Sequence, residues 1–343
     1  MIELINCLFY IFVFLILFSY PLNVFNLGSA IKTYQLGLFD TVLLNIVIHL
    51  NFLLFFSLFK ISLNLIFFFE FFFGLVFIII YFKNYLKYLK KNLFIFYFFC
   101  LSFSLFLVIS ANPTLAWDGV SHWLYKAQVY YQGGSYVDLK GLTYDHYPHL
   151  GSYIWAFFWK NNFLQLEYFG RFFFVFIFVA SIFSLVEKLK FFLSTIEVCA
   201  LILVIAYLCT DSFLFGGYQE YLLFSLFYIV SKLFQSFEKS SAKDKKYLLF
   251  LFVLTNSLFI WTKQEGFFYY IILSFLCLAF FTKNLKYKFL LTFLFFAPIA
   301  IYILIKIYFY GIFNFSAESI IHDSFIKNLT VSILFDKILY IFK

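Results

Sequence analysis

Ten long apolar runs, separated by short polar segments, limit what this sequence can fold into more than any other feature. A helix needs roughly 20 apolar residues, with a range of about 17 to 25, to cross the hydrocarbon core of a bilayer. The chain is 64% hydrophobic and 12% charged over 343 residues, which is more apolar surface than the core of one soluble domain can hide. We therefore predict an all-α protein, a polytopic transmembrane helix bundle of about ten spans. The predicted spans are residues 4–20, 41–59, 62–82, 93–110, 168–187, 195–211, 221–236, 246–262, 266–282 and 288–309.

The charged residues fit a membrane protein and argue against a nucleic-acid-binding one. The net charge is +8, but the lysines form short clusters between the apolar runs, as the cytoplasmic loops of membrane proteins require. We therefore predict a lipid bilayer environment and no nucleic-acid partner. The five cysteines lie within or beside apolar runs without a Cys-x-x-Cys pair, which argues against a disulfide framework or a zinc site.

The lysine clusters also predict which ends of the helices face the cytoplasm. All four clusters can face the cytoplasm if the short segment 149–160, which follows Pro148, does not cross the membrane. We predict that this segment is a helix lying on the membrane surface. Glu3, with no basic residue before the first apolar run, predicts a retained span rather than a cleaved signal peptide. The four clusters are Lys83, Lys87, Lys90 and Lys91; Lys188 and Lys190; Lys239, Lys243, Lys245 and Lys246; and Lys283, Lys286 and Lys288.

The predicted spans and loops divide the chain into three parts. We predict N-terminal transmembrane helices over residues 1–92, a second transmembrane module over 93–309, and a C-terminal tail over 310–343 that could lie along the membrane. Within the second module, the segment 111–167 would form one long outer loop with amphipathic helices beside the membrane.

The long outer segment collects polar side chains of the kind that carry chemistry. It contains three of the chain's five histidines. A helix that begins near Gly119 would place Asp118, His122 and Lys126 on one face, because residues four apart are neighbours on a helix. Asp118 could be a helix cap, since Asp accepts hydrogen bonds from first-turn amides, or it could take part in catalysis. For His122 and Lys126 the alternative is an ordinary solvated face.

Two shorter outer turns add acids and a lysine. Glu220 follows the Gly216-Gly217 pair and opens an apolar run. Lys263 lies on the outer side, against the rule for lysines, which predicts an anionic partner. That partner could be the nearby Glu265 or a phosphate group of a bound molecule.

Two further charged residues lie in apolar surroundings. Glu70 is enclosed by phenylalanines at a span centre, where an acid costs roughly 2.5–3.5 kcal/mol on insertion scales. We interpret Glu70 as a packing or assembly feature. Arg171 is the only arginine and lies where a span enters from the outer side. Its planar fork suits a phosphate or carboxylate in a way that lysine does not.

The order of these elements over residues 93–309 resembles the GT-C class of polyprenyl-phosphate-dependent glycosyltransferases. The resemblance is to the group of protein mannosyltransferases and aminoarabinose transferases, including bacterial RgtA/B/C/D-like members. The chain departs from the family pattern in two ways: Gly119 stands where a second acid often follows Asp118, and the outer loop follows the fourth predicted span, whereas better-known members place it after the first. The matching elements, in order, are Trp117-Asp118, Lys126-Ala127, Tyr147-Pro148-His149-Leu150, Arg171, Glu220 and Lys263-Gln264-Glu265-Gly266.

The resemblance implies an inverting transfer of a sugar from a polyprenyl-phosphate donor to an acceptor hydroxyl on a lipid, glycan or protein. Asp118 would be the general base or would orient the acceptor. Basic side chains would neutralise the phosphate leaving group. The family also implies a multi-pass protein of the bacterial inner membrane, with its site facing the periplasm or exterior. The residues implied to bind the substrates are His122, Lys126, His146, Tyr147, His149, Arg171, Glu220, Lys263 and Glu265.

A divalent metal ion stays an open question, because some GT-C relatives use one and others do not. Glu220, Glu265 and His122 could bind such an ion, or could bind the sugar or the acceptor. His146 and His149 do not form a strong zinc pair, since Pro148 interrupts their spacing. No other cofactor is predicted.

Three other functions stay open. A transporter or flippase for a lipid-linked or anionic substrate predicts charges within spans and internal repeats, whereas Glu70 is the charge at a span centre and no repeat is evident. An O-antigen ligase or polymerase is expected to rely on outer-loop arginines, and the chain has only Arg171. A non-catalytic assembly factor would tolerate Asp118→Asn, whereas a transferase would not.

Overall fold

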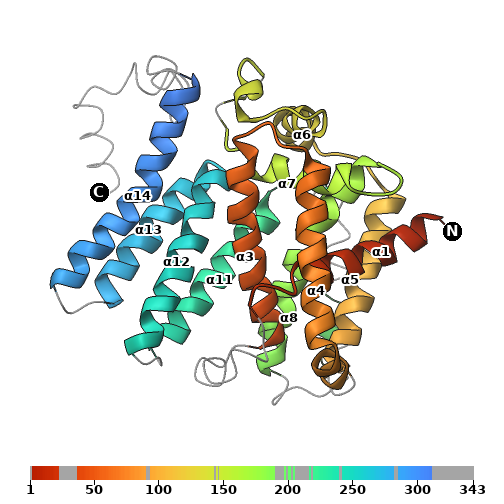
Figure 1. Cartoon of the computed structure of the whole chain (residues 1–343), viewed down its shortest axis with the longest axis horizontal. Coiled ribbons are helices and arrows are strands. Elements are labelled where there is room, and N and C mark those ends of the chain that lie inside the picture. The colour runs from red at the N-terminus through yellow and green to blue at the C-terminus, as the bar shows by residue number, and fades with distance from the viewer. Residues whose placement is uncertain are drawn as a thin grey trace, which may run out of the picture.

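The described residues of the computed structural model form helices and no strand. Most of the long helices run side by side in a bundle, and the segment between α5 and α8 covers one end of it (Figure 1). The described residues are 2–22, 37–89, 93–142, 144–145, 147–189, 197, 200–201, 204, 216–217, 219–238, 242–281 and 285–310.

A helix covers each predicted span except 195–211, of which only scattered residues are described. Stretches of α3, α4, α5 and α14, together with residues 167–187, are long and apolar enough to cross a membrane, which makes five candidate spans among the described residues. These stretches indicate a membrane protein. The helices are α1 (Ile2–Leu17), α3 (Leu38–Ser57), α4 (Leu63–Leu89), α5 (Leu93–Ala111), α8 (Phe172–Leu189), α11 (Glu220–Glu238), α12 (Ala242–Thr262), α13 (Glu265–Phe281) and α14 (Leu285–Tyr310).

Helix α8 lies at the centre of the bundle because it is apolar on nearly every face. A helix that is hydrophobic all round is stable only when it is buried, and almost all side chains from Phe172 to Val186 are buried. It contacts α3, α5 and α11. Helix α1 contacts α4 and α5, and α3 contacts α12, so helices from the regions 1–92 and 93–309 share one core.

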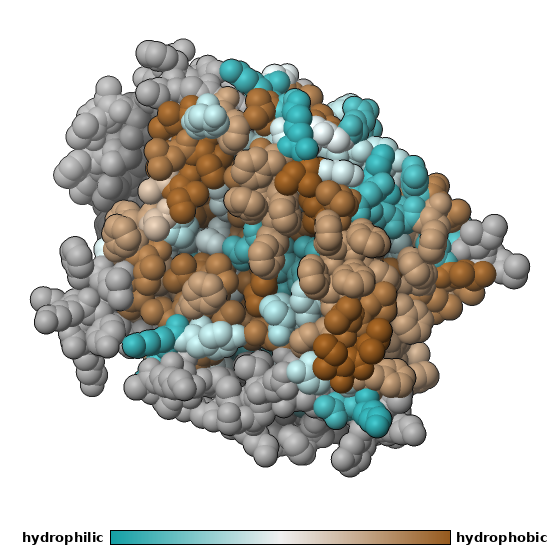
Figure 2. Space-filling model, in the orientation of Figure 1, coloured by the Kyte–Doolittle hydropathy of each residue, from teal (hydrophilic) through white to brown (hydrophobic). Residues whose placement is uncertain are grey.

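Helices α4 and α14 lie at the periphery and turn phenylalanines outward. Phe68 and Phe72 of α4, and Phe293 and Phe296 of α14, are exposed. Figure 2 shows hydrophobic side chains covering much of this face, whereas hydrophilic ones gather mainly toward the end that carries α6. Exposed aromatic surface of this extent is compatible with lipid, which solvates apolar side chains.

Two pairs of buried ionisable side chains join helices within the bundle. Lys232 of α11 lies 3.2 Å from Asp40 of α3, and both side chains are buried. The carboxylate of Glu70 lies 3.4 Å from His49 Nδ1, which joins α4 to α3. The position of Glu70 therefore agrees with the packing role predicted for it, and its partner is His49. Pairing reduces the cost of charge in a medium of low dielectric constant.

The outer segment 111–167 contains four short helices. The π-helical turn η1 (Gly119–Leu124) continues into α6 (Tyr125–Tyr131), and η2 (Tyr136–Leu139) and α7 (Leu150–Lys160) follow. The short helix η3 (Glu167–Arg171) then leads into α8.

The prediction that 149–160 lies on the surface is wrong for this fold. Every side chain of α7 from Leu150 to Phe158 is buried, and α7 packs between α6 on one side and α3 and α4 on the other. Its aromatic residues cover both faces of the helix, so neither face is suited to water. The predicted tail 310–343 lies outside the described residues apart from Tyr310, which ends α14.

We predict that the two ends of α5 lie on opposite sides of the membrane. In a chain whose own cysteines are replaced by alanine, Trp117→Cys probes the segment after α5, and Lys83→Cys probes the lysine-rich end of α4 that precedes it. Both side chains are exposed. A membrane-impermeant maleimide should label the first from outside intact cells and the second only from inside-out vesicles. Labelling of both from one side would contradict this topology.

Candidate functional site

A close backbone contact positions the start of η1 against the turn before α11. The amide of Ala116 donates a hydrogen bond to the Gly216 carbonyl oxygen at 2.9 Å. A side chain at Gly119 would overlap the same oxygen. Gly217, in the left-handed region at φ +93°, completes the turn beside Trp155. These glycines let two segments far apart in sequence touch, and so bring Asp118 near Glu220.

Asp118 is not a helix cap in this structure. Its backbone is helical and its side chain makes no capping hydrogen bond. The carboxylate oxygen Oδ1 lies 3.7 Å from His122 Nδ1, and the Asp118 side chain is 36% exposed. The capping role considered for Asp118 is therefore excluded, and its carboxylate is available for other contacts.

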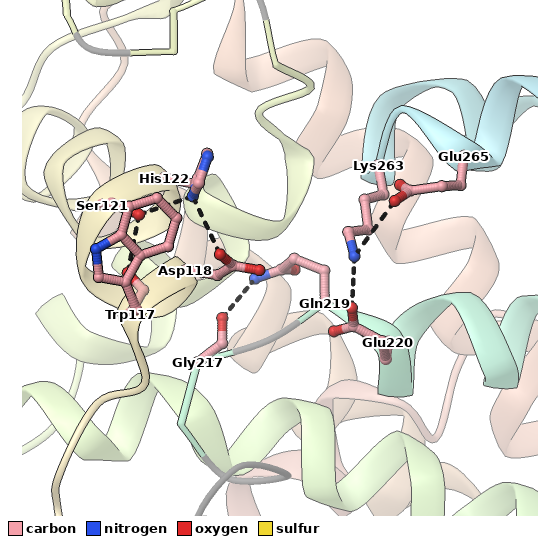
Figure 3. Close-up of polar contacts among 9 residues, drawn as sticks. All are labelled: Trp117, Asp118, Ser121, His122, Gly217, Gln219, Glu220, Lys263 and Glu265. Carbon is pink, nitrogen blue, oxygen red and sulfur yellow. Dashed lines mark hydrogen bonds and ion pairs between the residues drawn. The ribbon is translucent and has the colours of Figure 1, made fainter.

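Lys263 joins this region to two acids. It lies in the connection between α12 and α13, and its Nζ is 2.5 Å from Glu220 Oε1 and 3.7 Å from Glu265 Oε1. Figure 3 shows Lys263 reaching toward Glu220 while Asp118 and His122 approach from η1. Burial disfavours the charge of Lys263, but the hydrogen bond to Glu220 and the charges of Glu220, Glu265 and Asp118 raise its pKa above the ordinary value. The ammonium group is thus held in its charged form at neutral pH.

Tyr147 completes the group. Its ring centre lies 5.0 Å from that of His122, and burial, together with the charge of Glu265, raises the pKa of its hydroxyl. We call the set the polar cluster: Asp118, His122, Tyr147, Glu220, Lys263 and Glu265. All six are among the residues predicted from sequence, and the fold brings them together at one end of the bundle.

Lys126 and His149 do not belong to the polar cluster. The predicted common face of Asp118 and Lys126 fails because η1 is a π-helical turn, whose wider winding moves later residues around the axis. Lys126 is fully buried and donates to the Tyr147 carbonyl oxygen at 3.0 Å. Burial, with a contribution from Lys306, lowers its pKa well below the ordinary value. His149 is likewise buried, with Nε2 2.8 Å from Ser57 Oγ.

Arg171 is also placed elsewhere. Its Nη2 donates to the Pro113 carbonyl oxygen at 2.8 Å and its Nη1 to that of Thr114 at 3.1 Å. Its Nε lies 3.1 Å from Glu167 Oε1. The guanidinium group therefore fastens the segment after α5 to the start of α8, and these contacts occupy the fork that was predicted to bind phosphate.

Two further predictions concern His146 and a metal ion. His146 lies outside the described residues. As for a metal ion, no three His, Cys, Asp or Glu side chains converge to hold one in the described part of the chain. Around Glu220 and Glu265, the positive charge between the carboxylates is the ammonium of Lys263.

Sequence reasoning missed three residues beside the polar cluster. Ser121 Oγ lies 2.8 Å from His122 Nδ1, and the Tyr144 ring centre lies 4.0 Å from that of His122. Gln219 is fully buried, and Figure 3 shows its side chain between Asp118 and Glu220. The adjacency of Gln219 to Glu220 was the available signal, whereas the position of Tyr144 depends on the folding of the outer segment.

The arrangement combines two chemical functions in one place. A carboxylate beside an imidazole can accept a proton from a hydroxyl group. A fixed ammonium group can stabilise negative charge that develops on an oxygen atom. Comparison of the chain with protein-family models, with curated protein sequences and with solved structures gives no match. What the site can do is therefore argued from its geometry.

We predict that Gly119→Ala destabilises the protein although alanine is the better helix former. The added methyl group would overlap the Gly216 carbonyl oxygen, and overpacking of this kind costs about 1–3 kcal/mol. Thermal unfolding in detergent should show a lower midpoint for Gly119→Ala. The neighbouring Val120→Ala, at an exposed position, should leave the midpoint nearly unchanged. Equal midpoints for both variants would contradict the contact.

We predict that Arg171→Met mainly lowers stability. It leaves Glu167 without its ion partner in a largely buried position, and breaking a buried pair costs up to about 3–5 kcal/mol. The double variant Glu167→Gln/Arg171→Met removes both charges and should recover much of the loss in the same unfolding measurement. A single variant with normal stability that had lost substrate binding would instead indicate that Arg171 contacts the substrate.

Proposed function

We propose that this protein is a membrane glycosyltransferase that moves a sugar from a polyprenyl-phosphate donor to an acceptor hydroxyl. The reaction would take place at the extracytoplasmic face of the bacterial inner membrane, within a bundle of about ten spans. The observation that carries the proposal is the polar cluster itself. An acid–base pair, Asp118 and His122, faces an ammonium group, Lys263, beside helices that turn apolar surface outward.

The proposed chemistry assigns a role to each part of the polar cluster. Lys263 has three N–H donors. Glu220 accepts a hydrogen bond from one of them, and Glu265 is an ion-pair partner at 3.7 Å. Another donor would bind the phosphate and stabilise the charge that develops as the bond between sugar and phosphate breaks. Asp118 and His122 would activate the acceptor hydroxyl. Glu220 and Glu265 would orient Lys263 and accept hydrogen bonds from sugar hydroxyls.

The alternatives have weaker support. A transporter would use charges along its path, but the buried charges Asp40 and Lys232, and likewise His49 and Glu70, lie against each other. A ligase or polymerase that relies on outer arginines would need Arg171, which Glu167 and two backbone carbonyls already engage.

We predict that Asp118→Asn abolishes sugar transfer, because the amide cannot act as a base or stabilise a positive charge beside it. General acid–base groups contribute about 10²- to 10⁴-fold to rate, so a loss of at least 100-fold is expected. The measurement is transfer of radiolabelled sugar from a panel of polyprenyl-phosphate hexoses and pentoses in membranes that contain the protein.

Asp138→Asn is the matched control. Asp138 lies in the same outer segment but pairs with Lys60 at 2.9 Å and accepts a hydrogen bond from the amide of Ser135, the N-cap of η2, at 2.8 Å. The side-chain oxygen of asparagine can accept the same bond. This variant should transfer sugar at nearly the wild-type rate. Equal transfer by Asp118→Asn and wild type, at equal protein levels, would remove Asp118 from the mechanism. Absence of transfer by the wild type with every donor would overturn the proposed function.

A further inference from the structure

The hydrogen bonds around His122 determine which of its two ring nitrogens carries the proton. Ser121 Oγ donates its single hydrogen to the Trp117 carbonyl oxygen at 2.8 Å. The same Oγ lies 2.8 Å from His122 Nδ1, so it can only accept in that second contact. Nδ1 must therefore be the protonated nitrogen of the neutral ring. Asp118 Oδ1, 3.7 Å from Nδ1, lies on the same side of the ring and favours the same tautomer.

The other nitrogen, Nε2, is left with a lone pair. It has no hydrogen-bond partner among the described residues. In Figure 3 it points away from both Ser121 and Asp118. The ring is held by aromatic neighbours, because the ring centres of Tyr144 and Trp117 lie 4.0 Å and 5.4 Å from its own. Nε2 is thus a fixed acceptor on a side chain that is only 9% exposed.

Burial, helped by two nearby lysines, keeps the His122 ring neutral near pH 7. Burial lowers the pKa of His122, and the charges of Lys126 on α6 and Lys263 before α13 lower it further. Asp118 on η1 opposes them, but the net pKa lies below the ordinary value of about 6.5. The Tyr147 ring packs on the imidazole, and burial raises the pKa of its hydroxyl, so Tyr147 adds no charge near pH 7. As a class, a neutral imidazole is a stronger base than a carboxylate.

We infer that Nε2 of His122, rather than a carboxylate oxygen of Asp118, takes the proton of the acceptor hydroxyl, with Asp118 and Ser121 acting as positioning residues. This inference rests on the proposed function and deepens it. It also replaces the role of direct base that the family resemblance implies for Asp118.

The acceptor O–H bond breaks, its proton goes to Nε2, and the freed electron pair forms the new bond to the anomeric carbon. The bond from that carbon to the phosphate oxygen breaks, and its electron pair stays on the phosphate, where Lys263 stabilises it. The imidazolium formed at His122 is stabilised by Asp118, as the acid of an acid–histidine pair does.

The test is the pH dependence of sugar transfer by membranes that contain wild type or His122→Gln. The donor is the radiolabelled polyprenyl-phosphate sugar that the wild type accepts. The measured rate is the sum of sugar transferred to the acceptor and sugar released by hydrolysis. The wild-type rate should fall as the pH drops through a pKa below 6.5, because protonation of Nε2 removes the base. His122→Gln should be at least 100-fold slower and should lack this fall.

Two serine variants test the positioning role. Ser121→Ala removes the acceptor that selects the tautomer, so the rate of sugar transfer should drop several-fold. The decrease of this rate at acidic pH should persist. Ser104→Ala is the matched control, because Ser104 makes the same kind of backbone contact, to the Cys100 carbonyl oxygen at 2.8 Å, in an exposed position on α5. It should behave as wild type. Equal rates for Ser121→Ala and Ser104→Ala would contradict the role of Ser121.

The outcomes separate the two proposals. If the wild type transfers sugar, and His122→Gln shows the same transfer rate and the same decrease of that rate at acidic pH, the role inferred for His122 is wrong while the proposed function stands. If the wild type transfers nothing, the proposed function fails. If His122→Gln is inactive, His122→Ala assayed with added imidazole distinguishes a lost base from a misfolded site. Restored transfer supports the inference, and no restoration counts against it.

Discussion

The site depends on one backbone contact, at which the Gly216–Gly217 turn lies against the start of η1. The amide of Ala116 donates to the Gly216 carbonyl, and the missing side chain of Gly119 leaves room for that oxygen. Glu220 begins α11 directly after this turn, and Lys263 reaches Glu220 from the next connection. If the two segments were held further apart, Asp118 would face neither residue, and acid–base and anion-stabilising groups would not share one place.

A second constraint comes from the surroundings of the helices. Buried charge is costly where water is absent, and two described pairs inside the bundle join neighbouring helices, Asp40 with Lys232 and Glu70 with His49. The polar cluster differs because three acids share a single lysine. This excess of negative charge favours positive charge that develops during a reaction, on an imidazole ring or on a sugar ring whose glycosidic bond is breaking.

Several features of the fold and site could be read from the residues. Long apolar runs predicted the helices, since their length matches a bilayer and their composition does not suit water. The polar residues between the runs predicted Asp118, Glu220 and Lys263 as neighbours at one end of the bundle. The same reasoning failed for Lys126, because it assumed an ordinary helical turn where the chain forms a π-helical one. It failed for α7 because a short aromatic helix after a proline can lie on a surface or be buried.

The sequence by itself determined that the chain is helical, that its apolar surface suits a membrane, and which polar residues gather between the spans. These follow from composition and local order, which act over one helix at a time. Tertiary structure alone decided that Lys263 pairs most closely with Glu220, and that the backbone carbonyls of Pro113 and Thr114 engage Arg171. Those outcomes depend on distances and hydrogen-bond directions between segments far apart in the chain, which no local pattern of residues specifies.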